Sequence, residues 1–165
     1  MLYIDTSAII AALDPSDHRR EKALKILNSK EYKIISELGL VELANVLSRR
    51  REILIDLINR LGFKEEIVIT TLLYYIMKRF NLKYEAIKTY QVISIFNNIS
   101  KITKISLELL PRFKLKTLDL LHIAYIKALK NEGIPINTLA TVDKDFAKVE
   151  DLLEKEVGVK VHLIE

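Results

Sequence analysis

The sequence predicts an α/β fold of three layers, in which helices cover both faces of a central, mainly parallel sheet. Short apolar runs alternate with helical patterns along the chain, and this alternation implies parallel strands joined by right-handed crossovers. The length of 165 residues and the absence of a linker rich in Pro, Gly or Ser indicate one domain, residues 1–165.

Periodicity places the elements of the first half of the chain. Apolar residues spaced three and four apart indicate helices, and short apolar runs bounded by polar residues indicate strands. Ser36 stands where it can cap the helix that follows it. Residues of about 52–98 are expected to form an enlarged helical middle segment within the domain. The predicted elements are a strand at 1–4, helices at 6–13 and 17–29, a strand at 32–36, and helices at 37–50, 52–80 and 84–98.

The second half alternates in the same way. The pattern is weak at 99–105, where it favours a short strand, and Ser106 can cap a short helix that ends near Pro111. Gly133 and Pro135 then separate a helix from the next strand. The remaining predicted elements are a helix at 117–131, a strand at 136–142, a helix at 143–155 and a strand at 159–164.

Composition limits the classes of protein to consider. There is no cysteine, which excludes a disulfide framework and a thiolate metal site and is compatible with a cytoplasmic location. The longest nearly apolar stretch, Ile67 to Met77, is far shorter than the roughly 20 residues of a membrane-spanning helix. The amino terminus has no pattern of a secretory signal. A net charge of +4 and a pI of about 9.1 lean towards polyanionic partners.

Four acidic residues stand at comparable places in this pattern. Asp5 follows the first strand, and Glu42 lies among apolar residues of the helix after the second strand. Asp119 opens a later helix, and Asp143 follows the strand LATV. Each acid alone has an ordinary explanation as a helix cap, a turn residue or part of a solvated face. Because ligands of parallel sheets bind at the carboxyl ends of the strands, the four are together candidates for one cleft.

Converging carboxylates indicate a particular chemistry. They repel one another unless a cation lies between them, and oxygen ligands without cysteine select Mg²⁺ or Mn²⁺. One or two such ions activate water for the hydrolysis of a phosphodiester bond. The sequence offers no cysteine and no serine in a glycine-flanked elbow, so a covalent intermediate is not expected.

Four segments carry a more specific signal, in order and across the whole chain. They are IDTSAII at 4–10, ISELGLVELANVL at 35–47, LKTLDLLHIAYIKAL at 115–129 and LATVDKDF at 139–146. Together they resemble the PIN-domain nucleases, and most closely the ribonuclease toxins of the VapC family from toxin–antitoxin pairs. This resemblance implies a PIN-like fold, a Mg²⁺- or Mn²⁺-dependent endoribonuclease activity on RNA, and a small antitoxin protein as partner.

The resemblance also implies roles for single residues. Its catalytic and metal-ligating positions match Asp5, Glu42, Asp119 and Asp143. The hydroxyl groups that support them match Thr6 or Ser7, and Thr141.

Two neighbours of these acids leave alternatives open. Asp145 competes with Asp143 for the last acidic position, although the spacing from Thr141 favours Asp143. His122 lies one helical turn after Asp119. Because Mg²⁺ prefers oxygen, we interpret His122 as a packing or supporting residue.

Further expectations concern partners. The stretch between Glu42 and Asp119 is longer than expected for a compact toxin of this type, and the apolar helices in it predict a homodimer through the middle segment. Arg49 and Lys116 are candidate contacts for RNA phosphates, with a solvated surface as the ordinary alternative.

Other functions remain to be weighed against the nuclease. A PIN fold without metal can act as an RNA-binding or assembly module, but the presence of all four acids argues against it. A phosphoacceptor receiver domain needs an acidic pair after the first strand, and here Asp5 is followed by Thr-Ser. A phosphatase of the haloacid dehalogenase type needs a second aspartate where this chain has Ser7.

Overall fold

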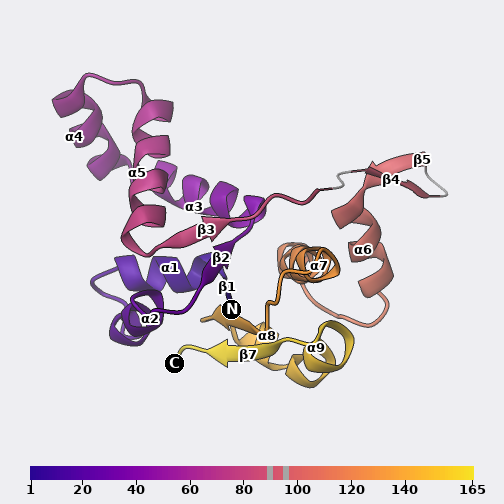
Figure 1. Ribbon diagram of the computed structural model, residues 1–165. Helices are drawn as coiled ribbons and strands as arrows, with labels where there is room; N and C mark the ends of the chain where they lie inside the picture. Colours follow the sequence, from indigo (N-terminus) through magenta and orange to yellow (C-terminus); the bar gives the residue numbers. More distant parts are fainter. Residues whose placement is uncertain (89–90, 95–96) are drawn as a thin grey trace.

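The computed structural model describes residues 1–88, 91–94 and 97–165, and a five-stranded parallel sheet lies at its centre (Figure 1). The order of the strands is β3-β2-β1-β6-β7, and every neighbouring pair is parallel. The strands are β1 (Leu2–Ile4), β2 (Lys33–Ile35), β3 (Leu82–Tyr84), β6 (Thr138–Thr141) and β7 (Lys160–Leu163).

Helices cover both faces of this sheet, as the sequence predicts. Tyr3 of β1 packs into a core formed with α6, α7 and α9, whereas its neighbours Leu2 and Ile4 pack into a second core with α1, α2 and α5. This division follows from the alternation of side chains along a strand. The helices are α1 (Thr6–Leu13), α2 (Arg20–Leu27), α3 (Glu37–Arg49), α4 (Arg51–Leu61), α5 (Glu65–Arg79), α6 (Lys101–Leu109), α7 (Thr117–Asn131), α8 (Lys144–Ala147) and α9 (Glu150–Val157).

The start of α3 lies unusually close to α1 and β2. Ser36 caps α3 as predicted, since its side chain accepts a hydrogen bond from the backbone N–H of Gly39 at 3.2 Å. A Cβ atom at Gly39 would lie 2.7 Å from Cγ1 of Ile35 and 3.3 Å from Oγ1 of Thr6. Glycine therefore permits the close approach that brings α3 to the end of β1.

The prediction of one helical middle segment at 52–98 is only partly correct. Residues 52–80 fall into two helices, α4 and α5, because Gly62 ends α4 in a left-handed conformation with φ of 69°. The two helices form a hairpin that projects from the sheet (Figure 1).

The helix predicted at 84–98 is wrong for residues 84–88, 91–94 and 97–98, whereas residues 89–90 and 95–96 of this prediction lie outside the described residues. Within the described residues, β3 joins the edge of the main sheet, and β4 (Gln91–Ser94) pairs with β5 (Asn97–Ser100) in an antiparallel hairpin. Asn81 and Asn97 have φ of 49° and 66°, which a helix interior does not accept and which asparagine tolerates.

Two boundaries in the second half also differ from the prediction. The strand predicted at 99–105 is mostly helix, because Ser100 and not Ser106 caps α6; its hydroxyl accepts from the N–H of Thr103 at 3.0 Å. The helix predicted at 143–155 is divided into α8 and α9. None of the helices in the described part of the chain has the length and apolar character needed to cross a bilayer.

Candidate active site

An acidic cleft of about 290 Å³ lies where the carboxyl ends of β1 and β6 meet the first turns of α1 and α7. The register explains the meeting, because Ile4 at the end of β1 pairs with Ala140 near the end of β6. The four predicted acids, Asp5, Glu42, Asp119 and Asp143, all line this cleft.

Asp5 is held by hydroxyl groups from two elements. It is 6% exposed and occupies the position before α1. Thr141 donates a hydrogen bond of 2.7 Å to Oδ2 of Asp5, and the Ser7 hydroxyl donates to the same oxygen. Thr141 also accepts from the backbone N–H of Asp143 at 2.9 Å. The threonine predicted as a supporting residue thus contacts two of the four acids.

Glu42 reaches the cleft from the middle of α3. Its Oε2 accepts a hydrogen bond from Thr6 at 2.8 Å and lies 2.9 Å from Nε2 of His122. Burial acts to raise the pKa of Glu42, but the contacts with His122 and Thr6 outweigh it and lower the pKa. Glu42 is therefore held as a carboxylate in a fixed orientation.

His122 connects this carboxylate to the interior of the protein. It is 2% exposed, and its Nδ1 lies 2.8 Å from the hydroxyl of Tyr3, which donates to Ser36 at 2.7 Å. Burial acts to lower the pKa of His122, but Glu42 and Asp5 outweigh it and raise the pKa. A protonated ring satisfies both contacts, because it donates from Nε2 to Glu42 and from Nδ1 to the Tyr3 oxygen.

Asp119 is the least satisfied of the four acids. Within the described residues, its Oδ2 is buried without a hydrogen-bond partner. Burial, followed by the negative charge of Asp143, raises the pKa of Asp119. Asp119, whose ionisation burial and the charge of Asp143 oppose and whose Oδ2 has no partner among the described residues, is therefore suited to a cation.

Asp143 and Asp145 differ in what they face. Asp143 caps α8 by accepting from the N–H of Asp145 at 2.8 Å, and it lines the cleft. Asp145 contacts Lys148 at 2.6 Å and Lys116 at 3.1 Å, and these two lysines lower its pKa. Asp145 therefore already has cationic partners, whereas Asp143 faces Asp119.

Two groups of possible ligand atoms can hold a metal ion among the described residues. Within each group the atoms lie within 4.8 Å of one another. The first group is Asp5, Glu42 and His122, and the second is Asp119, Asp143 and Asp145.

The two predicted phosphate contacts lie in different settings. Lys116 directly precedes α7 with its side chain 75% exposed, and its pKa is raised by Asp145 first and then by Asp143 and Asp119. Arg49 is exposed in the last turn of α3 and does not line the cleft. Asn45, one helical turn after Glu42, does line it.

Solved structures with the same fold come from VapC-type proteins. A chain of VapBC2 from Rickettsia felis, bound to a DNA fragment from its promoter, is 17% identical, has a TM-score of 0.57 and matches over 100% of both chains. VapC20 of Mycobacterium tuberculosis, a toxin that cleaves the sarcin–ricin loop, is 17% identical, has a TM-score of 0.56 and covers 90% of this chain and 95% of its own. VapBC-1 of nontypeable Haemophilus influenzae is 14% identical, has a TM-score of 0.53 and covers 99% and 98%.

Sequence comparison assigns the family. No curated protein matches the chain by sequence. The family model of the PIN domain matches residues 2–152, which is nearly the whole chain and includes all four predicted acids. Both the predicted fold class and the resemblance to PIN domains are confirmed, and the chain belongs to the PIN domain family.

Proposed function

We propose that the protein is a metal-dependent endoribonuclease and the toxin of a toxin–antitoxin pair, acting in the cytoplasm. The observation that carries this proposal is the meeting of Asp5, Glu42, Asp119 and Asp143 in one cleft at the carboxyl ends of the strands. We further propose that residues 1–165 act as one PIN-like domain, which is supported by the packing of α5 on α3 and by the place of β3 in the main sheet.

The four acids suit Mg²⁺ or Mn²⁺ as one or two ions. The donor set consists mainly of carboxylate oxygens, which these ions prefer, and the buried unpartnered oxygen of Asp119 is a ligand atom without another use among the described residues. Such an ion, when bound, lowers the pKa of a coordinated water and stabilises negative charge on the scissile phosphate.

The residues around the acids orient them. Ser7 and Thr141 fix one oxygen of Asp5, and Thr6 with His122 fixes one oxygen of Glu42. The chain has no cysteine, and neither Thr6 nor Ser7 stands in a glycine-flanked elbow, so water is the nucleophile in the proposed reaction. RNA phosphates are held by Lys116 beside the cleft and by Arg49 further along α3.

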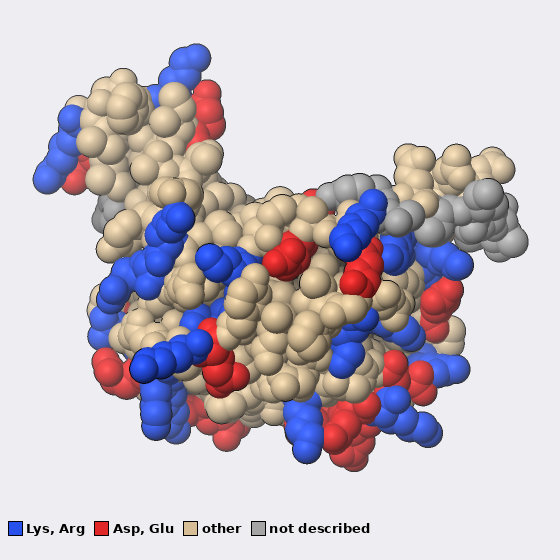
Figure 2. All heavy atoms as spheres, viewed as in Figure 1, with Lys and Arg blue, Asp and Glu red and all other residues tan. Residues whose placement is uncertain are grey.

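Two protein partners belong to the proposal. The similar VapBC structures support an antitoxin partner. A homodimer through α4 and α5 is supported by exposed apolar side chains there, and Figure 2 shows the hairpin mostly uncharged on one face. Tyr74 and Tyr75 are 62% and 60% exposed. Light scattering at micromolar concentration is expected to give the mass of a dimer, and a monomer mass would contradict this part of the proposal.

Cleavage of a labelled mixed single-stranded RNA tests the activity. We expect the protein to cut with Mg²⁺ or Mn²⁺, and excess EDTA or the substitution Asp5→Asn to abolish cutting. Asp151→Asn, which removes an exposed carboxylate in the first turn of α9, is the matched control and should cut normally. Absence of cutting by folded protein across several RNAs would instead support an RNA-binding or assembly module.

A further inference from the structure

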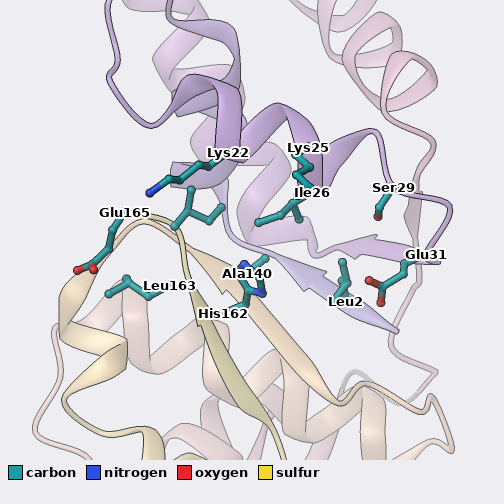
Figure 3. Close-up of a pocket in the computed structure, with 11 residues that line it drawn as sticks. Leu2, Lys22, Lys25, Ile26, Ser29, Glu31, Ala140, His162, Leu163 and Glu165 are labelled. Atoms are coloured by element: carbon teal, nitrogen blue, oxygen red, sulfur yellow. The ribbon is translucent and has the colours of Figure 1, made fainter.

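A second cavity, of about 630 Å³, lies between α2 and the strands β1, β6 and β7 (Figure 3). It shares no lining residue with the acidic cleft. Its volume falls within the range of about 300–1,000 Å³ that is usual for small-molecule sites.

The floor of this cavity is apolar. Leu2 of β1 and Ala140 of β6 line it from the sheet, and Ile164 lines it from the end of β7; all three are buried in the core on the α1–α2 face. Ile26 of α2 and Leu163 of β7 add partly buried apolar surface. An alkyl or aryl group is therefore the part of a ligand that this floor accommodates.

The rim carries positive charge without a partner. Lys22 and Lys25 line the cavity from α2, and among the described residues neither has an ion pair or a hydrogen bond. The two acids of the rim stand at opposite ends of the cavity (Figure 3). Glu165 already pairs with Lys144 at 3.5 Å, and Glu31 interacts electrostatically with a buried lysine of β2. The charge left for a ligand is positive.

An unpartnered hydroxyl group is the second polar feature of the wall. Among the described residues, Oγ of Ser29 is buried without a hydrogen-bond partner, and Ser29 lines the cavity just after α2. Its carbonyl oxygen accepts from the ammonium group of Lys33 at 2.7 Å, and Lys33 is 1% exposed. This hydroxyl lies at the end of the cavity beside Glu31, away from Lys22 (Figure 3).

We propose that this cavity binds an amphipathic carboxylate, whose apolar part lies on the floor and whose anionic group lies on the rim at Lys22 and Lys25. The site is separate from the nuclease cleft, so its ligand binding can be tested whether or not the protein cleaves RNA.

Three probes separate the contributions to binding. Decanoate has the tail and the charge, decanol has only the tail, and acetate has only the charge. In amide NMR spectra recorded below the micelle concentration, decanoate is expected to shift the signals of residues 22–31, 140 and 162–164. Decanol should bind more weakly and acetate should cause no shift. Shifts scattered over the whole protein, or no binding of decanoate, would overturn the proposal.

Variants test the lysines of the rim and the shape of the wall at Ser29. The double substitution Lys22→Gln and Lys25→Gln removes no hydrogen bond or ion pair among the described residues. It should weaken the affinity for decanoate about threefold to tenfold and leave the affinity for decanol unchanged. The control pair Lys64→Gln and Lys155→Gln changes two exposed lysines outside the cavity. It should change neither the affinity for decanoate nor the affinity for decanol. Ser29→Leu, which places a larger side chain in the wall of the cavity, should weaken the binding of both probes. Equal affinity for decanoate and decanol, or no effect of the Lys22 and Lys25 substitutions, would refute the anionic site.

Discussion

The hydroxyl of Thr141 donates a hydrogen bond of 2.7 Å to Oδ2 of Asp5, although 136 positions separate the two residues in the chain. The contact arises because β1 and β6 are parallel neighbours in register, so that the residues at their carboxyl ends meet. Thr141 is fully buried and also accepts from the N–H of Asp143 at 2.9 Å. One hydroxyl group therefore sets the positions of two acids in the cleft.

Replacement of this hydroxyl by a methyl group tests its role. Thr141→Val keeps the shape and the strand but removes both hydrogen bonds, so we expect the free energy of unfolding to fall by about 1–3 kcal/mol. RNA cleavage should fall about 10- to 100-fold, as for other groups that orient metal ligands. Thr138→Val is the control, because Thr138 is on the same strand and its exposed hydroxyl donates to the side chain of Asn137 at 3.2 Å. Equal effects of the two substitutions would show that the contact with Asp5 has no special role.

Tyr3 supports the other side of the cleft from within the core. Its hydroxyl contacts Ser36 and Nδ1 of His122, so Tyr3→Phe leaves a buried ring nitrogen without its partner. We expect a loss of about 1–3 kcal/mol in the free energy of unfolding, measured by urea denaturation. Tyr32→Phe removes an exposed hydroxyl that contacts Glu85 at 3.1 Å and should cost little. A Tyr3→Phe protein as stable as the wild type would contradict this interpretation.

The contacts of Glu132, which lies away from the cleft, predict that the free energy of unfolding depends on pH. Its carboxylate accepts from Nζ of Lys101 at 2.7 Å and from the backbone N–H of Lys88 at 3.0 Å. Burial acts to raise the pKa of Glu132, but these contacts outweigh it and lower the pKa. A lowered pKa stabilises the fold above the ordinary glutamate value, and this stabilisation is lost as the pH falls through the lowered value.

The comparison of Glu132→Gln with the wild type measures this contribution. At pH 7 the variant should be less stable by about 1–3 kcal/mol, and the difference should narrow as the pH falls to about 3. Glu154→Gln, in which the lost ion pair with Lys160 is exposed, should differ little at either pH. A difference for Glu132→Gln that does not change with pH would mean that shape, and not charge, matters at this position.

The sequence predicted those parts of the fold and the cleft that local pattern determines. The helices at 6–13 and 117–131 agree with α1 and α7 because their periodicity is unambiguous. Asp5, Asp119 and Asp143 stand at strand ends and helix starts, which the sequence marks, whereas Glu42 in the middle of α3 is matched through the resemblance to PIN domains. The segment at 84–98 was missed because its apolar residues fit either element, and tertiary pairing decided between them.

The hydrogen bonds around the acids depend on information that the sequence pattern does not contain. In the sequence, Tyr3 is one residue of an apolar strand, and nothing marks its hydroxyl as important. Its contact with His122 joins residues that are 119 positions apart. Whether Asp145 or Asp143 faces the cleft depends on the rotation of a helix of only four residues, α8. Such contacts follow from register and side-chain direction, so periodicity alone leaves them open.

Lys116 and Lys148 form a matched pair for the proposed contact with RNA. Both bind the carboxylate of Asp145, and Lys116 also interacts with Asp143 and Asp119 of the cleft. A lysine beside the acids can offset their repulsion of a phosphate, whereas a lysine that only neutralises Asp145 cannot.

We therefore expect Lys116→Gln to slow RNA cleavage several-fold and Lys148→Gln to leave it nearly unchanged. The plot of log rate against log salt should become shallower for Lys116→Gln by about 0.7, the value for one contact with a single-stranded phosphate. Both substitutions remove one partner of Asp145. Equal losses of cleavage rate would therefore show that the effect arises from Asp145 and not from a contact with the RNA. An unchanged salt dependence for Lys116→Gln would remove Lys116 from the RNA-binding surface, since a phosphate contact must release counterions.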